Sequence, residues 1–221
     1  MRKEKAKILV ATLTILGALL VLYFSVYGTA PRVEPRPHRA LGQVVAEEAG
    51  KLLGNGGRIT VIARNTAVFK NPAADVQMKA FYRAIKKAKL PLAATNAITL
   101  NPISLVRVPP GDAYEVLRKQ SDGDVVVSFL GPPVVGRELW PKLGNARHRV
   151  VAVCSGATPW QMNLKELFDQ NLLHMAVISR PTPETRLPKS SVLRIWFDHF
   201  YQVITPANLS DLPLPPGNRL Q

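Results

Sequence analysis

DVVVSFL, residues 124–130, is the stretch that decides the fold class of this chain. Its apolar side chains run from Val125 to Leu130, and Ser128 is the only interruption. A strand with one solvated face alternates apolar and polar residues, whereas a strand buried on both faces shows a continuous apolar run, as in parallel sheets. The stretch therefore predicts a central strand of a parallel sheet with helices on both faces.

Similar runs recur on both sides of this strand. Strands are predicted at residues 58–64 (RITVIAR), 97–108 (AITLNPISLVRV, one or two strands), 149–155 (RVVAVCS), 173–179 (LHMAVIS) and 200–204. Helical patterns separate them, at residues 40–53, 72–89, 112–120, 136–143 and 163–171. This alternation is typical of βαβ units with right-handed crossovers. We therefore expect an α/β three-layer sandwich with a mostly parallel sheet of about five strands.

Helix starts are marked by capping residues. Asn71 precedes Pro72, which is the order of an N-cap and a first-turn proline. Asp112 and Asn163 each stand three residues before a glutamate, the spacing of a capping box. In the helix that follows Asn71, the expected buried stripe consists of Met78, Phe81, Ile85 and Ala88.

A second decisive stretch is ILVATLTILGALLVLYFSVY, residues 8–27, which holds no charge and no proline. As a helix, 20 residues would be roughly 30 Å long, the thickness of the hydrocarbon core of a bilayer. A cleaved signal peptide is the alternative. However, the run is longer than the usual apolar region of a signal peptide, and Pro31 directly after the candidate cleavage site would hinder a peptidase. We therefore predict one uncleaved N-terminal transmembrane helix.

Basic residues flank this run on both sides, with an excess before it. The positive-inside rule then predicts a cytoplasmic N-terminus at residues 1–7 and an extracytoplasmic C-terminal domain at the inner (plasma) membrane. Residues 28–39 contain three prolines and predict an extended spacer. Residues 40–205 form the expected single α/β domain, and residues 206–221 a proline-rich tail.

Composition excludes several classes of site. The formal net charge is +14. Cys154 is the only cysteine, so one chain cannot form a disulfide framework or a cysteine-rich zinc site. The four histidines show no metal-ligand spacing, and neither a P-loop nor a Gly-x-Gly-x-x-Gly motif is present. We therefore expect no metal and no cofactor.

Ligands of open parallel sheets bind beyond the carboxyl ends of the strands. This rule selects short glycine, hydroxyl and arginine loops, which can receive a polar solute or a small anion. The candidate ligand-binding residues are Arg64, Asn65, Thr66, Gly131, Ser155, Gly156 and Arg180. Such residues also serve simply to turn the chain.

Two further features allow other chemistries. Cys154 ends a strand and is the best nucleophile candidate, with His148 or His174 as its possible base, although a cysteine there is typically a small core residue. Lys79, Arg83, Lys86 and Lys87 form a basic face of the helix at residues 72–89. That face would suit anionic lipid or another anionic surface, but it is also typical of a solvated helix face.

The order of elements from about residue 58 to 205 resembles one lobe of the type 1 periplasmic binding proteins, or more loosely a flavodoxin-like sandwich. The resemblance implies the fold but carries over no binding residue. A two-lobed binding protein needs nearly twice this domain. The layout also resembles that of bacterial single-pass proteins with a domain behind an N-terminal anchor.

These observations favour a membrane-anchored, extracytoplasmic, non-catalytic binding or assembly module. The expected partners are the membrane, through residues 8–27, and a protein or an anionic surface; nucleic acid is not expected, and a small-molecule ligand stays open. The alternatives are a tethered hydrolase that uses Cys154 and a module that contacts anionic lipid or nucleic acid through the basic helix face.

Overall fold

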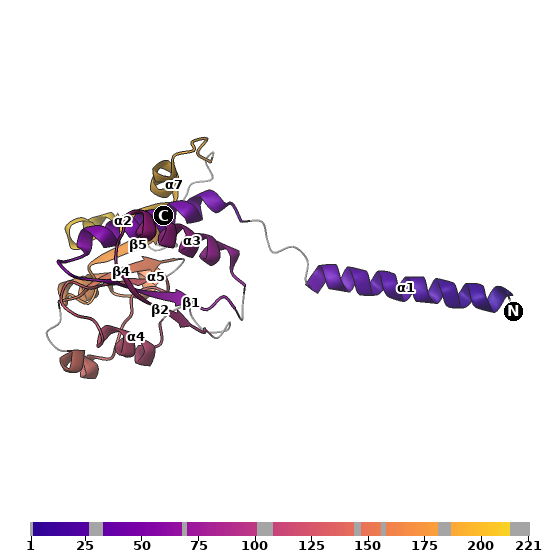
Figure 1. Ribbon diagram of the computed structural model, residues 1–221, viewed down its shortest axis with the longest axis horizontal. Coiled ribbons are helices and arrows are strands. Elements are labelled where there is room, and N and C mark those ends of the chain that lie inside the picture. Colours follow the sequence, from indigo (N-terminus) through magenta and orange to yellow (C-terminus); the bar gives the residue numbers. More distant parts are fainter. Residues whose placement is uncertain are drawn as a thin grey trace, which may run out of the picture. The chain divides into compact units, whose positions relative to one another are not determined.

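A computed structural model of the chain describes residues 2–26, 33–67, 70–100, 108–143, 147–155, 158–180 and 187–212. The chain divides into two compact units, Met1–Glu34 and Pro35–Gln221. The first unit contains one helix, α1 (Arg2–Val26), and the second contains every other element (Figure 1).

Helix α1 covers most of the stretch for which we predict a transmembrane helix. Its apolar side chains are exposed, for example Leu13 at 63% and Val21 at 70%. Nevertheless, in the part of the chain that the structure describes, no helix was found to be long and apolar enough to cross a membrane. The helix is present, but the transmembrane assignment of residues 8–27 is not supported by the structure.

A six-stranded sheet forms the centre of the second unit, one strand more than expected. The strands follow each other in the order β2-β1-β3-β4-β5-β6; the first five are parallel, and β6 is antiparallel to β5. As predicted, the stretch at residues 124–130 contains a central strand, β3, whose four residues from Val125 to Ser128 are all buried. The strands are β1 (Ile59–Arg64), β2 (Leu92–Ile98), β3 (Val125–Ser128), β4 (Arg149–Cys154), β5 (Met175–Ser179) and β6 (Tyr201–Ile204).

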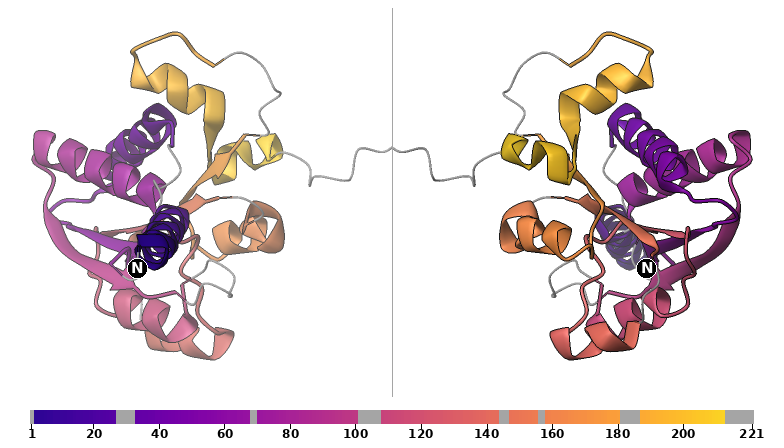
Figure 2. Two further views of the ribbon diagram at one scale, coloured as in Figure 1. Left: turned by 90° about the vertical axis from the view of Figure 1, so that its right-hand side faces the viewer. Right: turned by 90° about the vertical axis from the view of Figure 1, so that its left-hand side faces the viewer.

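Both faces of the sheet are covered, which confirms the mostly parallel α/β fold. Val125 and Val127 pack with α2 (Pro35–Leu52), α3 (Pro72–Lys87) and α7 (Leu193–Phe200). Val126, between them, packs on the other side with α4 (Pro110–Leu117) and α6 (Leu164–Asp169). This alternation follows from the period of two along a strand. Figure 2 shows the two groups of helices on opposite sides of the sheet. Shorter elements are η1 (Arg137–Leu143), α5 (Thr158–Gln161) and η2 (Pro206–Asp211).

Helix α2 begins at Pro35, five residues before the predicted start at residue 40. Pro35 and Pro37 were expected to keep the chain extended as part of a spacer. In the first turn of a helix, however, the missing N–H of proline costs nothing, since those N–H groups have no intrahelical partner. Residues 33 and 34 are the described part of the predicted spacer that is not helical.

The capping predictions have mixed outcomes. The backbone N–H of Ala74 donates to Asn71 Oδ1 at 3.1 Å, which confirms Asn71 as the N-cap of α3. Asn163 likewise caps α6, since it accepts from the backbone N–H of Glu166 at 3.1 Å. The predicted cap at Asp112 is wrong, because α4 begins at Pro110 and Asp112 lies in its first turn.

Helices α2 and α3 pack unusually closely at Gly42. A Cβ atom at this position would lie 2.1 Å from the backbone oxygen of Gln77 and 2.9 Å from the backbone nitrogen of Phe81. Only a residue without a side chain allows this approach. Gly42 therefore sets the distance between the two helices.

Candidate functional site

The strand order identifies one edge of the sheet as the place for a ligand. From β1 the chain crosses to β2 on one side, and β3 then lies on the other side of β1. Neighbouring crossovers diverge at such a point, and the carboxyl ends of the strands leave a crevice there. The ends of β1, β3 and β4 are therefore the expected site.

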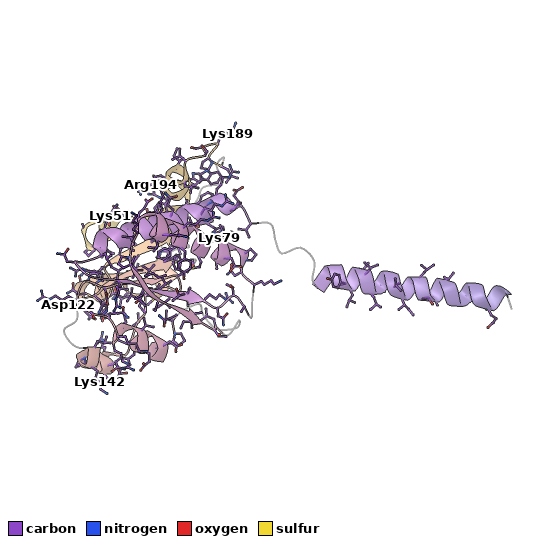
Figure 3. The ribbon with its side chains drawn as sticks, in the orientation of Figure 1. Lys51, Lys79, Asp122, Lys142, Lys189 and Arg194 are labelled. Carbon is purple, nitrogen blue, oxygen red and sulfur yellow. The ribbon has the colours of Figure 1, made fainter. Side chains whose placement is uncertain are left out.

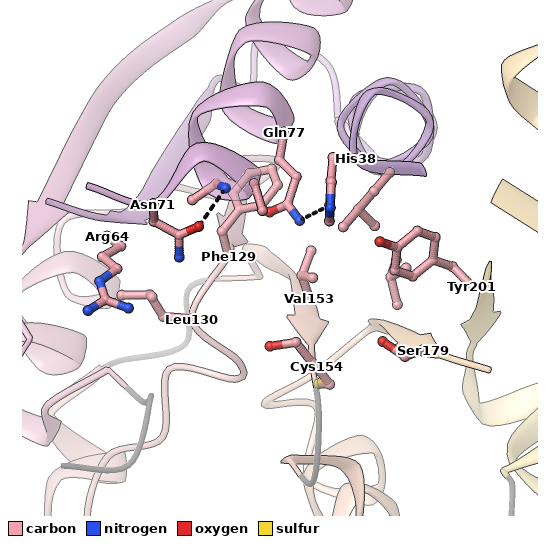
Figure 4. Close-up of a pocket in the computed structure, with 15 residues that line it drawn as sticks. His38, Arg64, Asn71, Gln77, Phe129, Leu130, Val153, Cys154, Ser179 and Tyr201 are labelled. Atoms are coloured by element: carbon pink, nitrogen blue, oxygen red, sulfur yellow. Dashed lines mark hydrogen bonds between the residues drawn. The ribbon is translucent and has the colours of Figure 1, made fainter. Parts of the chain in front are cut away.

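A cavity of about 340 Å³ lies at this edge (Figure 4). Its volume is at the lower end of the range for small-molecule pockets, about 300 to 1,000 Å³. Its polar side chains come from two helices, the ends of three strands and the start of β6. They are His38, Arg64, Asn71, Gln77, Ser155, Ser179 and Tyr201.

A hydrogen bond between α2 and α3 forms one wall of the cavity. Gln77 Nε2 lies 3.1 Å from His38 Nδ1. Burial lowers the pKa of His38 below its ordinary value of 6.5, so the ring is neutral at pH 7. With the amide of Gln77 as donor, Nδ1 is the acceptor and the ring proton is on Nε2. This wall offers uncharged hydrogen-bonding groups.

Tyr201 and Ser179 form the opposite end of the cavity from Arg64 and Asn71 (Figure 4). They are direct partners across the antiparallel pair β5 and β6. Burial raises the pKa of Tyr201 to about 12, so its hydroxyl keeps its proton. The hydroxyl points toward the interior of the cavity in Figure 4. The pair supplies neutral hydroxyl groups to a ligand.

Arg64 ends β1 and lies beside the first turn of α3. Asn71, Ala73 and Ala74 of that turn line the same end of the cavity. The apolar lining between the two ends includes Phe129, whose ring packs edge-to-face on the buried Phe81 with centroids 5.4 Å apart. The cavity thus has one cationic end, one hydroxyl-bearing end and an apolar centre.

The predicted ligand-binding residues do not all meet at this cavity. Arg64 and Ser155 line it. Asn65 and Thr66 are engaged in local hydrogen bonds, with the Asn65 amide donating to Thr99 and the Thr66 hydroxyl donating to Asp75. Binding by any of these residues stays a prediction.

Gly131 and Arg180, which are also predicted ligand-binding residues, do not line the cavity. Gly131 has a positive φ of 81° and serves the turn after β3, without lining the cavity. The Arg180 guanidinium donates through Nε to the backbone oxygen of Tyr201 at 2.9 Å and does not line the cavity. Gly156 lies outside the described residues.

The proposed pairing of Cys154 with a histidine base is wrong. Cys154 ends β4, whereas His148 precedes that strand and His174 precedes β5, so both histidines lie at the amino edge of the sheet. Arg149 and Cys154 are the first and last residues of β4. The five steps along the strand between them span roughly 16 Å. Cys154 is fully buried, and burial raises the pKa of its thiol to about 12. Its thiol therefore keeps its proton at neutral pH, although Cys154 is also one of the residues that line the cavity.

His174 has a structural role at that amino edge. The backbone N–H of Val150 donates to His174 Nδ1 at 3.2 Å, which requires that nitrogen to be unprotonated. Burial, with smaller effects of Arg149 and His148, lowers the pKa of His174 to about 4.

We expect this histidine to make the domain less stable in mild acid. Between pH 6.5 and 4 the unfolded chain binds a proton that the folded chain does not, so the free energy of unfolding falls as the pH falls. Because the ring is partly exposed, we expect a loss of about 1 to 2 kcal/mol. Urea unfolding of His174→Asn, whose amide oxygen still accepts from Val150, should show a weaker loss over this range. An equally steep loss in the variant would contradict this role.

The predicted basic face is solvent-exposed. Lys79, Arg83, Lys86 and Lys87 are exposed, and Figure 3 shows Lys79 pointing outward. Arg83 and Lys87, with Arg39 of α2, line a second hollow of about 450 Å³ between α2 and α3. Contact with an anionic surface through this face stays a prediction. Within the described ranges no group of three or more His, Cys, Asp or Glu side chains is placed to hold a metal ion.

His38, Asn71, Gln77 and Tyr201 are polar lining residues that the sequence does not mark as ligand groups. His38 was assigned to the spacer, Asn71 was recognised only as a helix cap, and Gln77 lies on a helix face without a motif. Ser179 and Tyr201 meet only because β6 pairs antiparallel with β5. The one local signal for Gln77 is its polar side chain among the mostly apolar residues in the first half of α3.

Neither a family model nor a curated protein matches the sequence. Solved structures with a similar fold include an ABC transporter solute-binding protein from Burkholderia graminis C4D1M, solved in complex with D-arabinose. It is 13% identical over 80% of this chain and 62% of its own, with a TM-score of 0.51. A protein from Mycobacterium smegmatis is 16% identical over 80% and 59%, with a TM-score of 0.49. A periplasmic ribose ABC transporter protein from Conexibacter woesei is 12% identical over 64% and 45%, with a TM-score of 0.46.

The match to the Burkholderia solute-binding protein confirms the predicted resemblance to binding proteins at the level of the fold. At such low identity, the likeness concerns the fold alone. The chain spans 45 to 62% of the length of these three structures.

Proposed function

We propose that the domain is a non-catalytic binding module that takes a small polar solute in the cavity at the carboxyl edge of the sheet. The observation that carries the proposal is the composition of this cavity. Uncharged hydrogen-bonding groups of His38, Gln77, Ser179 and Tyr201 surround an apolar centre at the topological switch point. Such a lining orients a hydroxylated or amide-bearing solute.

The chemistry of the cavity supports binding over catalysis. A nucleophile needs a base within hydrogen-bonding reach. Cys154 and His38 both line the cavity, but the thiol of Cys154 is fully buried among apolar residues on the α4 and α6 side of the sheet, and burial raises its pKa to about 12. The raised pKa of Tyr201 also makes its hydroxyl a poor nucleophile at neutral pH.

We further propose that residues 8–27 hold the domain at the extracytoplasmic side of the inner membrane, with residues 1–7 in the cytoplasm. The support comes from the sequence and not from the structure: a charge-free run of 20 residues and the basic segment before it. The test is fractionation followed by protease treatment of spheroplasts. Recovery of the intact chain in the soluble fraction, or protection of the domain from external protease, would reject this part of the proposal.

The fold neighbour that was solved with D-arabinose makes aldoses the first ligands to test. A solute that binds only the folded chain raises its free energy of unfolding by about 2.7 kcal/mol at 100 times its Kd. We expect at least one aldose or related polyol to raise the unfolding temperature of the purified domain.

Gln77→Ala removes one donor from the cavity wall and should weaken binding of that solute roughly three- to tenfold, the value of one neutral hydrogen bond. Calorimetric titration measures the change. Gln170→Ala is the matched control, since Gln170 is exposed at the C-cap of α6 and lines no part of the cavity. Equal weakening in both variants, or none in Gln77→Ala, would place the bound solute elsewhere.

A further inference from the structure

The described lining of the cavity carries positive charge and no negative charge. Arg64 is the one residue with a full charge among the described lining residues, and neither Asp nor Glu occurs among them. His38 is neutral at pH 7 because burial lowers its pKa. A cavity of this kind favours a ligand that brings a negative charge.

Arg64 is available to such a ligand. In the part of the chain that the structure describes, no carboxylate forms an ion pair with it. An arginine without a carboxylate partner keeps its five donors for a ligand, and its planar group binds a carboxylate or phosphate in a bidentate manner.

The first turn of α3 adds to the positive potential at the same end. The helix has 16 residues, and Ala73 and Ala74 of its first turn line the cavity beside Arg64. The helix dipole places partial positive charge at this end. The N–H groups of Ala74 and Asp75 are already bonded to Asn71, so the helix contributes mainly through its dipole. The Asp75 carboxylate of the same turn accepts from the Thr66 hydroxyl. Arg64 and the helix end therefore favour an anionic group at one end of the cavity.

The other end requires a different chemistry. Ser179 and Tyr201 present hydroxyl groups, and the bonded pair of His38 and Gln77 lies along the wall. These groups match the hydroxyls of a ligand and carry no charge. A ligand that fits both ends has an anionic group at one terminus and hydroxyl groups along a short chain.

We propose that the cavity binds a small polyhydroxy anion, with its carboxylate or phosphate at Arg64 and its hydroxyls toward Ser179 and Tyr201. This inference rests on the proposed function and narrows its ligand class from polar solutes to anionic ones.

The test compares three probes that share one carbon skeleton: D-arabinose, D-arabinonate and D-arabinose 5-phosphate. Calorimetric titration of the domain at constant ionic strength gives the Kd of each. We expect at least one of the two anions to bind ten or more times as tightly as the neutral sugar. The anion with the lower Kd identifies whether the cavity prefers carboxylate or phosphate.

Arg64→Gln should reduce this preference to within about threefold, because it removes the charge that distinguishes the anion from the neutral sugar. Arg58→Gln is the matched control: Arg58 is exposed immediately before the other end of the same strand and does not line the cavity. It should leave the preference unchanged. Unfolding curves of both variants establish that they are folded.

The outcomes separate the inference from the function on which it rests. If the neutral sugar binds as tightly as both anions, or if the preference persists in Arg64→Gln, the inference is overturned and the binding function stands. If neither the three probes nor a wider set of aldoses and polyols binds at about 10 mM, where even a millimolar Kd gives near saturation, both are overturned.

Discussion

Gly42→Ala is expected to lower the free energy of unfolding by about 3 kcal/mol, a value at the upper end for overpacked sites. The new methyl group would lie 2.1 Å from the backbone oxygen of Gln77, and a backbone atom cannot move without moving its helix. Helices α2 and α3 must then separate. Urea unfolding followed by circular dichroism measures the loss.

Gly50→Ala provides the control in the same helix. Its Cβ would lie 2.9 Å from a terminal carbon of Leu90, a flexible side chain that can turn away. The gain in helix propensity of about 1 kcal/mol offsets that movement, so the stability should change by less than about 1 kcal/mol. Equal effects of the two substitutions would show that close packing at Gly42 is not the cause.

Trp196→Ala is expected to cost about 3 to 5 kcal/mol, the range for removal of a large buried aromatic side chain. The indole is fully buried, and its Nε1 donates to the backbone oxygen of Ser190 at 2.7 Å. Its ring also stacks on Phe200, with centroids 6.0 Å apart, and the Arg36 guanidinium lies 4.4 Å from its centroid. The substitution therefore removes one of the two buried side chains, Trp196 and Phe197, that pack α7 against the core.

Two companion variants separate these contributions. Trp196→Phe keeps an aromatic ring but loses the hydrogen bond, and should cost about half as much as Trp196→Ala. Ile195→Ala, at the neighbouring position with 48% exposure, should change stability by no more than about 0.5 kcal/mol. A large effect of Ile195→Ala would mean that α7 is sensitive to any change, and not that Trp196 anchors it.

The parts of the fold that were predictable are those in which the local pattern and the tertiary environment agree. The strands at residues 124–130, 149–155 and 173–179 are rich in β-branched residues because they are buried on both faces. The edge strand β2 (Leu92–Ile98) overlaps the prediction at residues 97–108 only in its last two residues, and residues 101–107 lie outside the described part of the chain. Most residues of β2 are exposed, and its sequence, LAATNAI, has no strong strand pattern. Pro35 was assigned to a spacer because sequence alone does not distinguish a first-turn proline from a helix breaker.

The candidate site was predictable only where it follows from strand direction. Arg64 and Ser155 were identified because parallel strands bring their carboxyl ends to one edge. The same rule could have excluded His148 as a partner of Cys154, since the two stand at opposite ends of one strand. His38, Gln77 and Tyr201 come together through the packing of α2 on α3 and through the antiparallel pairing of β6. Neither of these long-range contacts is encoded in a short stretch of residues.

The antiparallel strand β6 has a consequence for how the site comes into being during synthesis. It brings Tyr201 to a cavity that His38 also lines, so the lining joins the first helix of the domain, α2, to β6. A ribosome must translate nearly the whole domain before the cavity can close. Any product that ends before β6 lacks Tyr201, so solute binding would report that the chain had been made and folded at least through β6.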